Sequence, residues 1–183
     1  MDAGRTVQVI RCRRKSIGIR VTDGGEVIVR APLRTPDAEI RRVLESKRDW
    51  IEKTLAKVNS RAQAPKLTAG EIEDLADQAL KEIPPRVKAW AEKIGVTYGR
   101  ITIRNQKTRW GSCSARGNLN FNCVLMLCPE AVLDYVIVHE LCHRKELNHS
   151  PRFWAEVAKV MPDYKQRRKW LKTEGQAIIS RLR

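Results

Sequence analysis

Three histidines and one glutamate lie close together in the sequence, and all four are residue types that bind or use a metal ion. His139 and His143 are four residues apart with Glu140 beside the first, and His149 follows. On a helix, residues four apart lie on one face, so both rings can contact the same ion. Glu140 can then accept a proton from water without being a ligand. The sequence contains no other histidine, and this clustering predicts a metal site.

His149 can reach the same ion only if the helix ends before it. Ten residues of straight helix would place it roughly 15 Å further along the axis. Asn148 tolerates the left-handed conformation that ends helices, and Ser150 followed by Pro151 is typical of an N-cap and the first position of a new helix. We therefore expect a turn between residues 146 and 150 that presents His149 from a loop. Three protein nitrogens and an open fourth position are typical of catalytic zinc.

Such a site predicts metal-assisted hydrolysis with one zinc ion per chain. Zinc lowers the pKa of its bound water to about 7 and polarises the carbonyl of the bond that is cleaved. Glu140 would take the proton of that water and pass it to the leaving amine. Hydrogen bonds from the ring N–H groups fix the histidine tautomers, and the sequence offers three acidic partners without choosing among them: Asp134, Glu146 and Glu156.

The element that must carry the pair has the pattern of a buried helix. Pro129 suits the first helical position, and acidic side chains precede basic ones along the stretch, as the helix dipole favours. The positions between are apolar nearly all round: Val132, Leu133, Tyr135, Val136, Ile137, Val138 and Leu141. Polar side chains on such a helix need partners, and a metal ion satisfies both histidines.

The first third of the chain predicts a small sheet followed by a helix. The segments 7–10, 17–21 and 26–29 are apolar and alternate in part, which favours an antiparallel sheet with a basic exposed face. A helix begins near Pro36 and has one apolar stripe: Ile40, Val43, Leu44, Trp50, Ile51 and Leu55. The polar stretch 59–65 is the best candidate linker. We therefore expect an N-terminal sheet and helix over 1–60 and a catalytic domain over 68–183.

The segment before the histidines combines a helix with two strands. The pattern of residues 68–93 predicts a helix that is broken or kinked at Pro84-Pro85. One face of this helix is expected to be buried, and it consists of Ile72, Leu75, Ala76, Ala79, Leu80 and Ile83. Strands are expected within 97–105 and 118–127. The turn 109–114 lies between the two strands.

Composition limits the class of protein. The 183 residues suffice for one domain, or one with a small appendage, and 42% are hydrophobic, so the chain can bury a core. The formal net charge of +15 favours polyanionic partners such as nucleic acid or nucleotides. No stretch resembles a bilayer span or a signal peptide, so we expect a cytoplasmic protein without a membrane partner. The five cysteines follow no C-x-x-C spacing and predict reduced thiols.

From Arg109 onward, the sequence resembles the YgjP-like metallopeptidase family, relatives of the SprT-like and other small zincins. The resemblance rests on the turn 109–114, the strand 118–122 and the run from Tyr135 to Trp154. It implies an α+β fold with a zincin-like core and a mixed or antiparallel sheet. It also implies zinc held by the three histidines, and a strand around 118–126 that borders the cleft as an edge for an extended peptide. The candidate substrate-binding residues there are Asn120, Asn122 and Arg109.

The resemblance leaves more than one activity open. A peptide or protein substrate is the first interpretation, a metal-dependent nucleoside triphosphate (UTP) pyrophosphatase the second, and a nucleic-acid-associated protease of SprT type the third. The sequence has no glycine-rich phosphate loop of G-x-x-x-x-G-K type, which weakens the second.

Plainer interpretations stand beside the functional ones. A His-Glu-x-x-His run also arises by chance, with its histidines hydrogen-bonded in a core. Trp110 more often packs a corner of the fold than binds substrate. The basic segment 165–169 suits either nucleic acid or a solvated helix face. Buried free cysteine is common, so core packing is expected of four thiols: Cys113, Cys123, Cys128 and Cys142.

Overall fold

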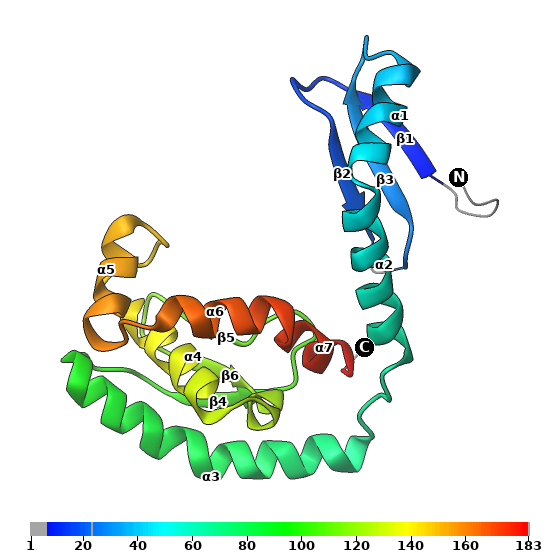
Figure 1. Cartoon of the computed structure of the whole chain (residues 1–183). Helices are drawn as coiled ribbons and strands as arrows, with labels where there is room; N and C mark the ends of the chain where they lie inside the picture. Colours follow the sequence, from blue (N-terminus) through cyan, green and yellow to red (C-terminus); the bar gives the residue numbers. More distant parts are fainter. Residues whose placement is uncertain (1–6, 23, 183) are drawn as a thin grey trace. The chain divides into compact units, whose positions relative to one another are not determined.

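A computed structural model describes residues 7–22 and 24–182 of the chain, so the first six residues of the expected N-terminal portion lie outside the described residues. The chain divides into two compact units, Met1–Ala64 and Pro65–Arg183. Each unit has its own buried apolar side chains. The division falls within the polar stretch that separates the two portions in the sequence. Figure 1 shows the elements of both units.

The N-terminal unit is built on a three-stranded mixed sheet in which β3 is central. β1 (Val7–Cys12) pairs with β3 (Val27–Pro32) in parallel, and β2 (Gly18–Val21) pairs with β3 antiparallel. The expected all-antiparallel sheet is therefore wrong for β1. The physical reason lies in β3, whose Val29 and Ala31 are fully buried, because the most apolar strand takes the protected central position.

Two helices follow the sheet, where one apolar stripe was expected. α1 (Asp37–Ser46) ends at Lys47, whose backbone leaves the helical region, and α2 (Arg48–Gln63) begins directly after it. Ile40 of α1 packs with β3, and Ile51 of α2 packs with Val27. Because the axis changes at Lys47, Trp50 falls outside the buried stripe and is 48% exposed.

The C-terminal unit begins with the long helix α3 (Ala69–Ile94), which runs through Pro84 and Pro85 without a break. Of the break or kink expected there, the break is wrong: the helix is continuous and bends along its length (Figure 1). Each proline removes one backbone hydrogen bond. The helix remains continuous because its buried face packs along α4 (Glu130–Cys142) and the short helix η1 (Cys123–Leu127). Leu80, expected on that face, is 56% exposed because it lies on the outer side of the curve.

The sheet of the C-terminal unit also has its last strand in the centre. β6 (Leu119–Asn122) pairs in parallel with β4 (Ile101–Arg104) and antiparallel with β5 (Gly111–Cys113). The expectation that β6 is an edge strand is therefore wrong. Its Leu119 and Phe121 are fully buried, and a strand with such side chains is best protected between two others. The edges of this sheet are β4 and β5.

Helix α4 (Glu130–Cys142) is buried on nearly all sides, as its sequence predicts. It packs against α3, β5 and two later helices. The remaining helices of the described C-terminal unit are α5 (Pro151–Val160), α6 (Tyr164–Thr173) and α7 (Gly175–Ser180). The combination of helices and small mixed sheets is an α+β fold, in which α4 has a fixed position.

No helix among residues 7–22 and 24–182 has the length and apolarity needed to cross a bilayer.

Candidate metal centre

The end of α4 brings two of the three histidines together. His139 lies in the last turn of the helix, and His143 is the residue that caps it. Their ring centres are 5.0 Å apart. This is the neighbour relation that the four-residue spacing predicts. Both rings are thus presented by a helix that the surrounding core holds in place.

The chain leaves α4 through successive tight turns and reaches His149 on a loop. The backbone N–H groups of Arg144 and Lys145 donate to Leu141 and Cys142, respectively. The predicted loop position of His149 is therefore confirmed. The left-handed conformation expected of Asn148 is wrong, because no described residue other than glycine has a positive φ. Several small turns change the direction of the chain gradually, so no single residue has to reverse it.

The loop ends where the sequence predicts a new helix. Ser150 is the N-cap of α5, and its side chain accepts a hydrogen bond from the backbone N–H of Phe153. Pro151 follows in the first turn. This cap fixes the backbone directly after His149 and so restrains the position of the third ring.

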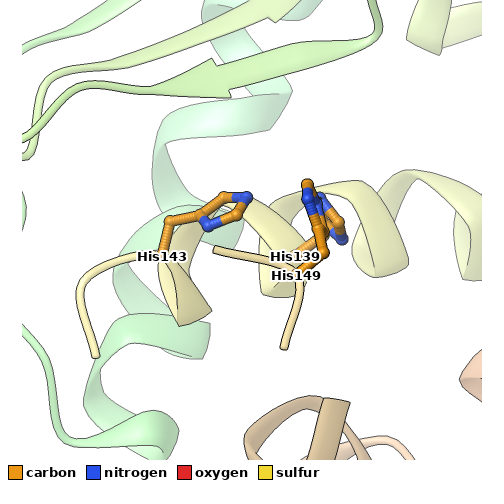
Figure 2. A group of neighbouring side chains, drawn as sticks. All are labelled: His139, His143 and His149. Atoms are coloured by element: carbon orange, nitrogen blue, oxygen red, sulfur yellow. The ribbon is translucent and has the colours of Figure 1, made fainter. Parts of the chain in front are cut away.

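One nitrogen from each of the three rings lies within 4.8 Å of the other two. Nε2 of His139 and Nε2 of His149 are 2.9 Å apart. Figure 2 shows the three rings gathered in one place, two of them from α4 and its end and one from the following loop. Ligands of one tetrahedral zinc ion lie roughly 3.3 Å apart, given zinc–nitrogen bonds of about 2.0–2.1 Å. The three nitrogens are therefore close to the spacing that a single ion requires.

Protonation of the rings also suits a metal. Nδ1 of His143 lies 3.1 Å from the backbone oxygen of Glu146. Because a carbonyl oxygen only accepts, Nδ1 carries the proton and Nε2 has a free lone pair. Burial, followed by the neighbouring His143 and His149, lowers the pKa of His139 to about 3, and burial also lowers the pKa of His149. Neutral imidazoles with free lone pairs are the form that binds metal.

Nε2 of His139 is the nitrogen that faces the cluster, since it lies 2.9 Å from Nε2 of His149. Nδ1 of the same ring is buried and makes no hydrogen bond with any described residue. Nε2 is therefore the atom of His139 that would hold an ion. The donor set of three imidazoles fits zinc, which favours nitrogen and sulfur ligands.

Glu140 directly follows His139 in α4 and is only 6% exposed. Burial raises the pKa of its carboxyl group to about 8. Gly111 of β5 lies directly against it: a Cβ added to Gly111 would be 2.9 Å from both Cγ and Oε1 of Glu140. Sequence analysis missed this contact, because nothing local links position 111 with position 140.

Aromatic side chains surround the histidines. Phe153 is fully buried, and its ring centre is 4.5–4.9 Å from those of all three histidines. Trp154 is half-buried and stacks on His149 at 5.6 Å with an interplanar angle of 27°. These rings keep the imidazoles in fixed orientations.

Two of the three acidic candidates for holding the histidine rings pair with basic side chains instead. Asp134 pairs with Arg86 at 3.2 Å, and Glu156 pairs with Lys145 and Lys159. Glu146 acts through its backbone oxygen on His143. A main-chain carbonyl therefore takes the orienting role for which the sequence offered three carboxylates.

The candidate substrate-binding residues take part in hydrogen bonds that hold the segment 106–112 to β6. Asn122 is buried, and its Nδ2 donates to the backbone oxygens of Gln106 and Arg109 at 2.6 and 2.8 Å. Nδ2 of Asn120 donates to Oγ of Ser112 at 3.1 Å. Arg109 is exposed. These hydrogen bonds attach the loop before β5 to the centre of the sheet.

Trp110 and the cysteines follow the structural interpretation. A Cβ added to Gly175 would meet the indole of Trp110 at 2.8 Å, so this tryptophan packs against the start of α7. All five cysteines are free thiols, and Cys123 and Cys142 are buried in the core. Burial raises the pKa of Cys142 to about 11.

Two solved structures of limited similarity are those of metallopeptidase zymogens. Abylysin of Pyrococcus abyssi is 25% identical, with a TM-score of 0.45 over 50% of this chain and 95% of that one. Jannalysin of Methanocaldococcus jannaschii is 22% identical, with a TM-score of 0.46 over 51% of this chain and 96% of that one.

A curated relative and a family also match the sequence. The relative is an Escherichia coli (strain K12) protein named UTP pyrophosphatase, 30% identical over 97 residues. The match takes in 51% of this chain and 58% of the length of that relative. The family is described as YgjP-like, metallopeptidase domain, and it matches residues 15–76 and 69–174. These two segments cover most of both units and every residue of the histidine cluster, and the chain therefore belongs to the YgjP-like metallopeptidase family.

Proposed function

We propose that this chain is a zinc-dependent metallopeptidase in which His139, His143 and His149 hold one zinc ion and Glu140 is the general base. The observation that carries the proposal is the approach of three ring nitrogens to within 4.8 Å of one another beside a buried carboxyl group. Membership of a metallopeptidase family supports it. Three nitrogen ligands would leave a fourth position for water or substrate, as in catalytic zinc sites.

The chain's own residues account for the proton transfers. When bound, zinc supplies a Lewis acid that polarises the peptide carbonyl and acidifies water. Glu140 takes a proton from the water whose oxygen attacks the carbonyl carbon, and then donates it to the nitrogen of the leaving amine as the C–N bond breaks. The hydrogen bond from His143 to Glu146 keeps its Nε2 directed at the site.

The structure suggests where an extended peptide would lie. β5 is an edge strand, and its Gly111 touches Glu140. A peptide that adds to this edge would pass next to the carboxyl group that acts as base. β5 therefore replaces β6 as the strand proposed to bind substrate.

Metal content and casein hydrolysis, measured on the same samples, test this proposal. We expect about one zinc per wild-type chain, weaker zinc binding in His149→Ala, and unchanged zinc binding in Glu140→Gln. Casein hydrolysis should fall at least 100-fold in both variants, because each removes an essential group. Glu130→Gln is the matched control: Glu130 lies on the same helix, is exposed, and forms a surface ion pair with Arg86, so zinc and activity should both persist.

Two results would contradict the proposal. Full hydrolysis by zinc-loaded Glu140→Gln would mean that another group is the base. Zinc binding unaffected by His149→Ala would mean that the third ligand is a different residue.

A second candidate function comes from the curated relative named UTP pyrophosphatase. The net charge of +15 would attract a triphosphate. UTP should therefore be assayed with casein on the same zinc-loaded samples. Turnover of UTP that is lost in Glu140→Gln, without casein cleavage, would replace the first candidate by the second.

A further inference from the structure

A positive charge is fixed beside the histidine cluster by an aromatic ring. Arg168 of α6 lies over Trp154, with its guanidinium carbon 4.2 Å from the ring centre. The same indole lies 5.6 Å from His149 and 5.8 Å from His139 between ring centres. Cation–π attraction favours this position of the guanidinium. Trp154 thus links Arg168 to two of the three histidines.

The hydrogen-bond donors of Arg168 have no partner among residues 7–22 and 24–182. Four other arginines of the described residues 65–182 are half-buried, and each donates to a protein oxygen: Arg86, Arg144, Arg167 and Arg181. Arg168 is equally half-buried but makes no hydrogen bond or ion pair with a described residue. A guanidinium offers five N–H donors in a planar fork, and no nitrogen of Arg168 is among the buried unpaired atoms of the described residues, so its donors are accessible from solvent. These donors are available to a group from outside the chain.

Arg168 reaches the site through Trp154, whose ring lies against those of both His139 and His149. A fixed cation beside three metal-binding rings disfavours a bound metal ion by repulsion. An anionic group that lies near both positive charges would remove this cost, which indicates the kind of ligand that the site accepts.

We propose that Arg168 binds a carboxylate of the peptide substrate next to the bond that is cleaved, either an acidic side chain or the C-terminal carboxylate. A guanidinium and a carboxylate match in a bidentate pair, with two parallel N–H···O hydrogen bonds. The inference rests on the proposed peptidase function and names its substrate class. It makes Arg168 a specificity-determining residue, whose donors are ready before substrate arrives.

Paired peptides separate this role from general attraction by the basic protein. Zinc-loaded wild type, Arg168→Gln, Arg168→Lys and Lys169→Gln are assayed on peptides that differ only by Glu or Gln, each with a free or an amidated C terminus. Lys169 is exposed on the same helix, so its variant loses the same charge away from Trp154. We expect wild type to prefer a carboxylate-bearing peptide, and Arg168→Gln to lose about 10- to 100-fold in kcat/KM on that peptide alone. Arg168→Lys should recover part of the loss.

The two kinds of carboxylate give different patterns. Preference for Glu over Gln with either terminus identifies an acidic side chain. Preference for the free over the amidated terminus identifies the C-terminal carboxylate. An unchanged preference in Arg168→Gln, or an equal loss in Lys169→Gln, would overturn the proposal.

A binding measurement keeps this inference separate from the proposed function. Zinc-loaded Glu140→Gln is titrated calorimetrically with the same peptides, with and without Arg168→Gln, after zinc content and the melting temperature show that each variant is folded. We expect the carboxylate peptide to bind about 10-fold or more tightly only when Arg168 is present. Such binding without cleavage by wild type would reject the peptidase and keep the anion site. Equal affinity of the peptides for both forms would reject the anion site.

Discussion

Gly111 shows how one position without a side chain can determine the geometry of another. Its φ is not in the left-handed region, so glycine is required there for space and not for backbone conformation. The neighbouring atoms belong to Glu140 and to the backbone oxygen of Asn120, which would be 3.1 Å from an added Cβ. The sheet backbone cannot give way easily, so a side chain at 111 would displace the Glu140 carboxyl group.

Replacing Gly111 by alanine should therefore reduce activity while sparing the metal. We expect Gly111→Ala to lose about 10- to 100-fold in kcat, because a displacement of about 1 Å at a catalytic group has an effect of that size. Zinc content should equal that of wild type. Gly70→Ala is the control, since nothing lies within 4 Å of an added Cβ there and helical glycine is replaced favourably. Full activity of Gly111→Ala would show that Glu140 has room to move.

The site residues that the sequence could predict are those that lie close to one another along the chain. His139, Glu140 and His143 follow from helical spacing alone, and the turn to His149 follows from Ser150 and Pro151. Gly111 and Arg168 could not be identified, because each meets the cluster through a contact with another element. The left-handed backbone conformation predicted for Asn148 was wrong for a further reason: asparagine permits this conformation without requiring it.

At the scale of elements, the start of α3 is a capping box formed by Thr68 and Glu71. The backbone N–H of Thr68 donates to the Glu71 carboxylate at 2.8 Å, and the backbone N–H of Glu71 donates to Oγ1 of Thr68 at 3.2 Å. The hydrogen bonds from Thr68 lower the pKa of Glu71. The carboxylate therefore stabilises the fold above its unfolded pKa, and this stability is lost as pH falls through the folded pKa.

Two substitutions test this cap. Thr68→Ala should lower the free energy of unfolding by about 1 kcal/mol at pH 7. Glu71→Ala should lower the melting temperature at pH 7, and its effect should shrink as the pH falls through the lowered pKa of Glu71, where the wild-type carboxyl becomes protonated. Glu73→Ala, exposed in the same helix, is the control. A difference between wild type and Glu71→Ala that does not shrink in acid would rule out the ionised carboxylate as its source.

Elements were predictable where their own pattern decided the outcome. The apolar run of α4 gave its extent and burial correctly. The path of α3 did not follow from Pro84 and Pro85, because packing against α4 and η1 outweighs two lost backbone hydrogen bonds. Strand order could not be predicted for either sheet, because the central position of β3 and of β6 depends on how deeply each strand is buried relative to the other two strands of its sheet.

At the scale of the molecule, the two units differ in what they contribute to the site. The described buried apolar residues of the N-terminal unit all precede position 59, whereas those of the C-terminal unit all follow position 66. The histidine cluster, Glu140, Gly111 and Arg168 belong to the C-terminal unit. The division by core predicts that this unit contains all the parts needed to bind the metal.

A fragment comprising residues 65–183 should therefore fold and bind zinc. We expect a cooperative thermal transition and a zinc dissociation constant within about threefold of that of the full chain. Circular dichroism and competition with a chromogenic chelator measure these two properties. The same fragment with His149→Ala is the control for specific binding. An unfolded fragment would show that the first 64 residues complete the second core.

The cap of α4 and the loop after it divide the cluster into unequal parts. Two rings stand on a helix that the core immobilises, while the third is exposed on a loop. An ion at the proposed site should accordingly bind in two steps, first to His139 and His143 on the helix and then to His149 as the loop closes. The rate of metal dissociation would then be set by the opening of the six-residue segment 144–149, and not by the strength of any single bond to nitrogen.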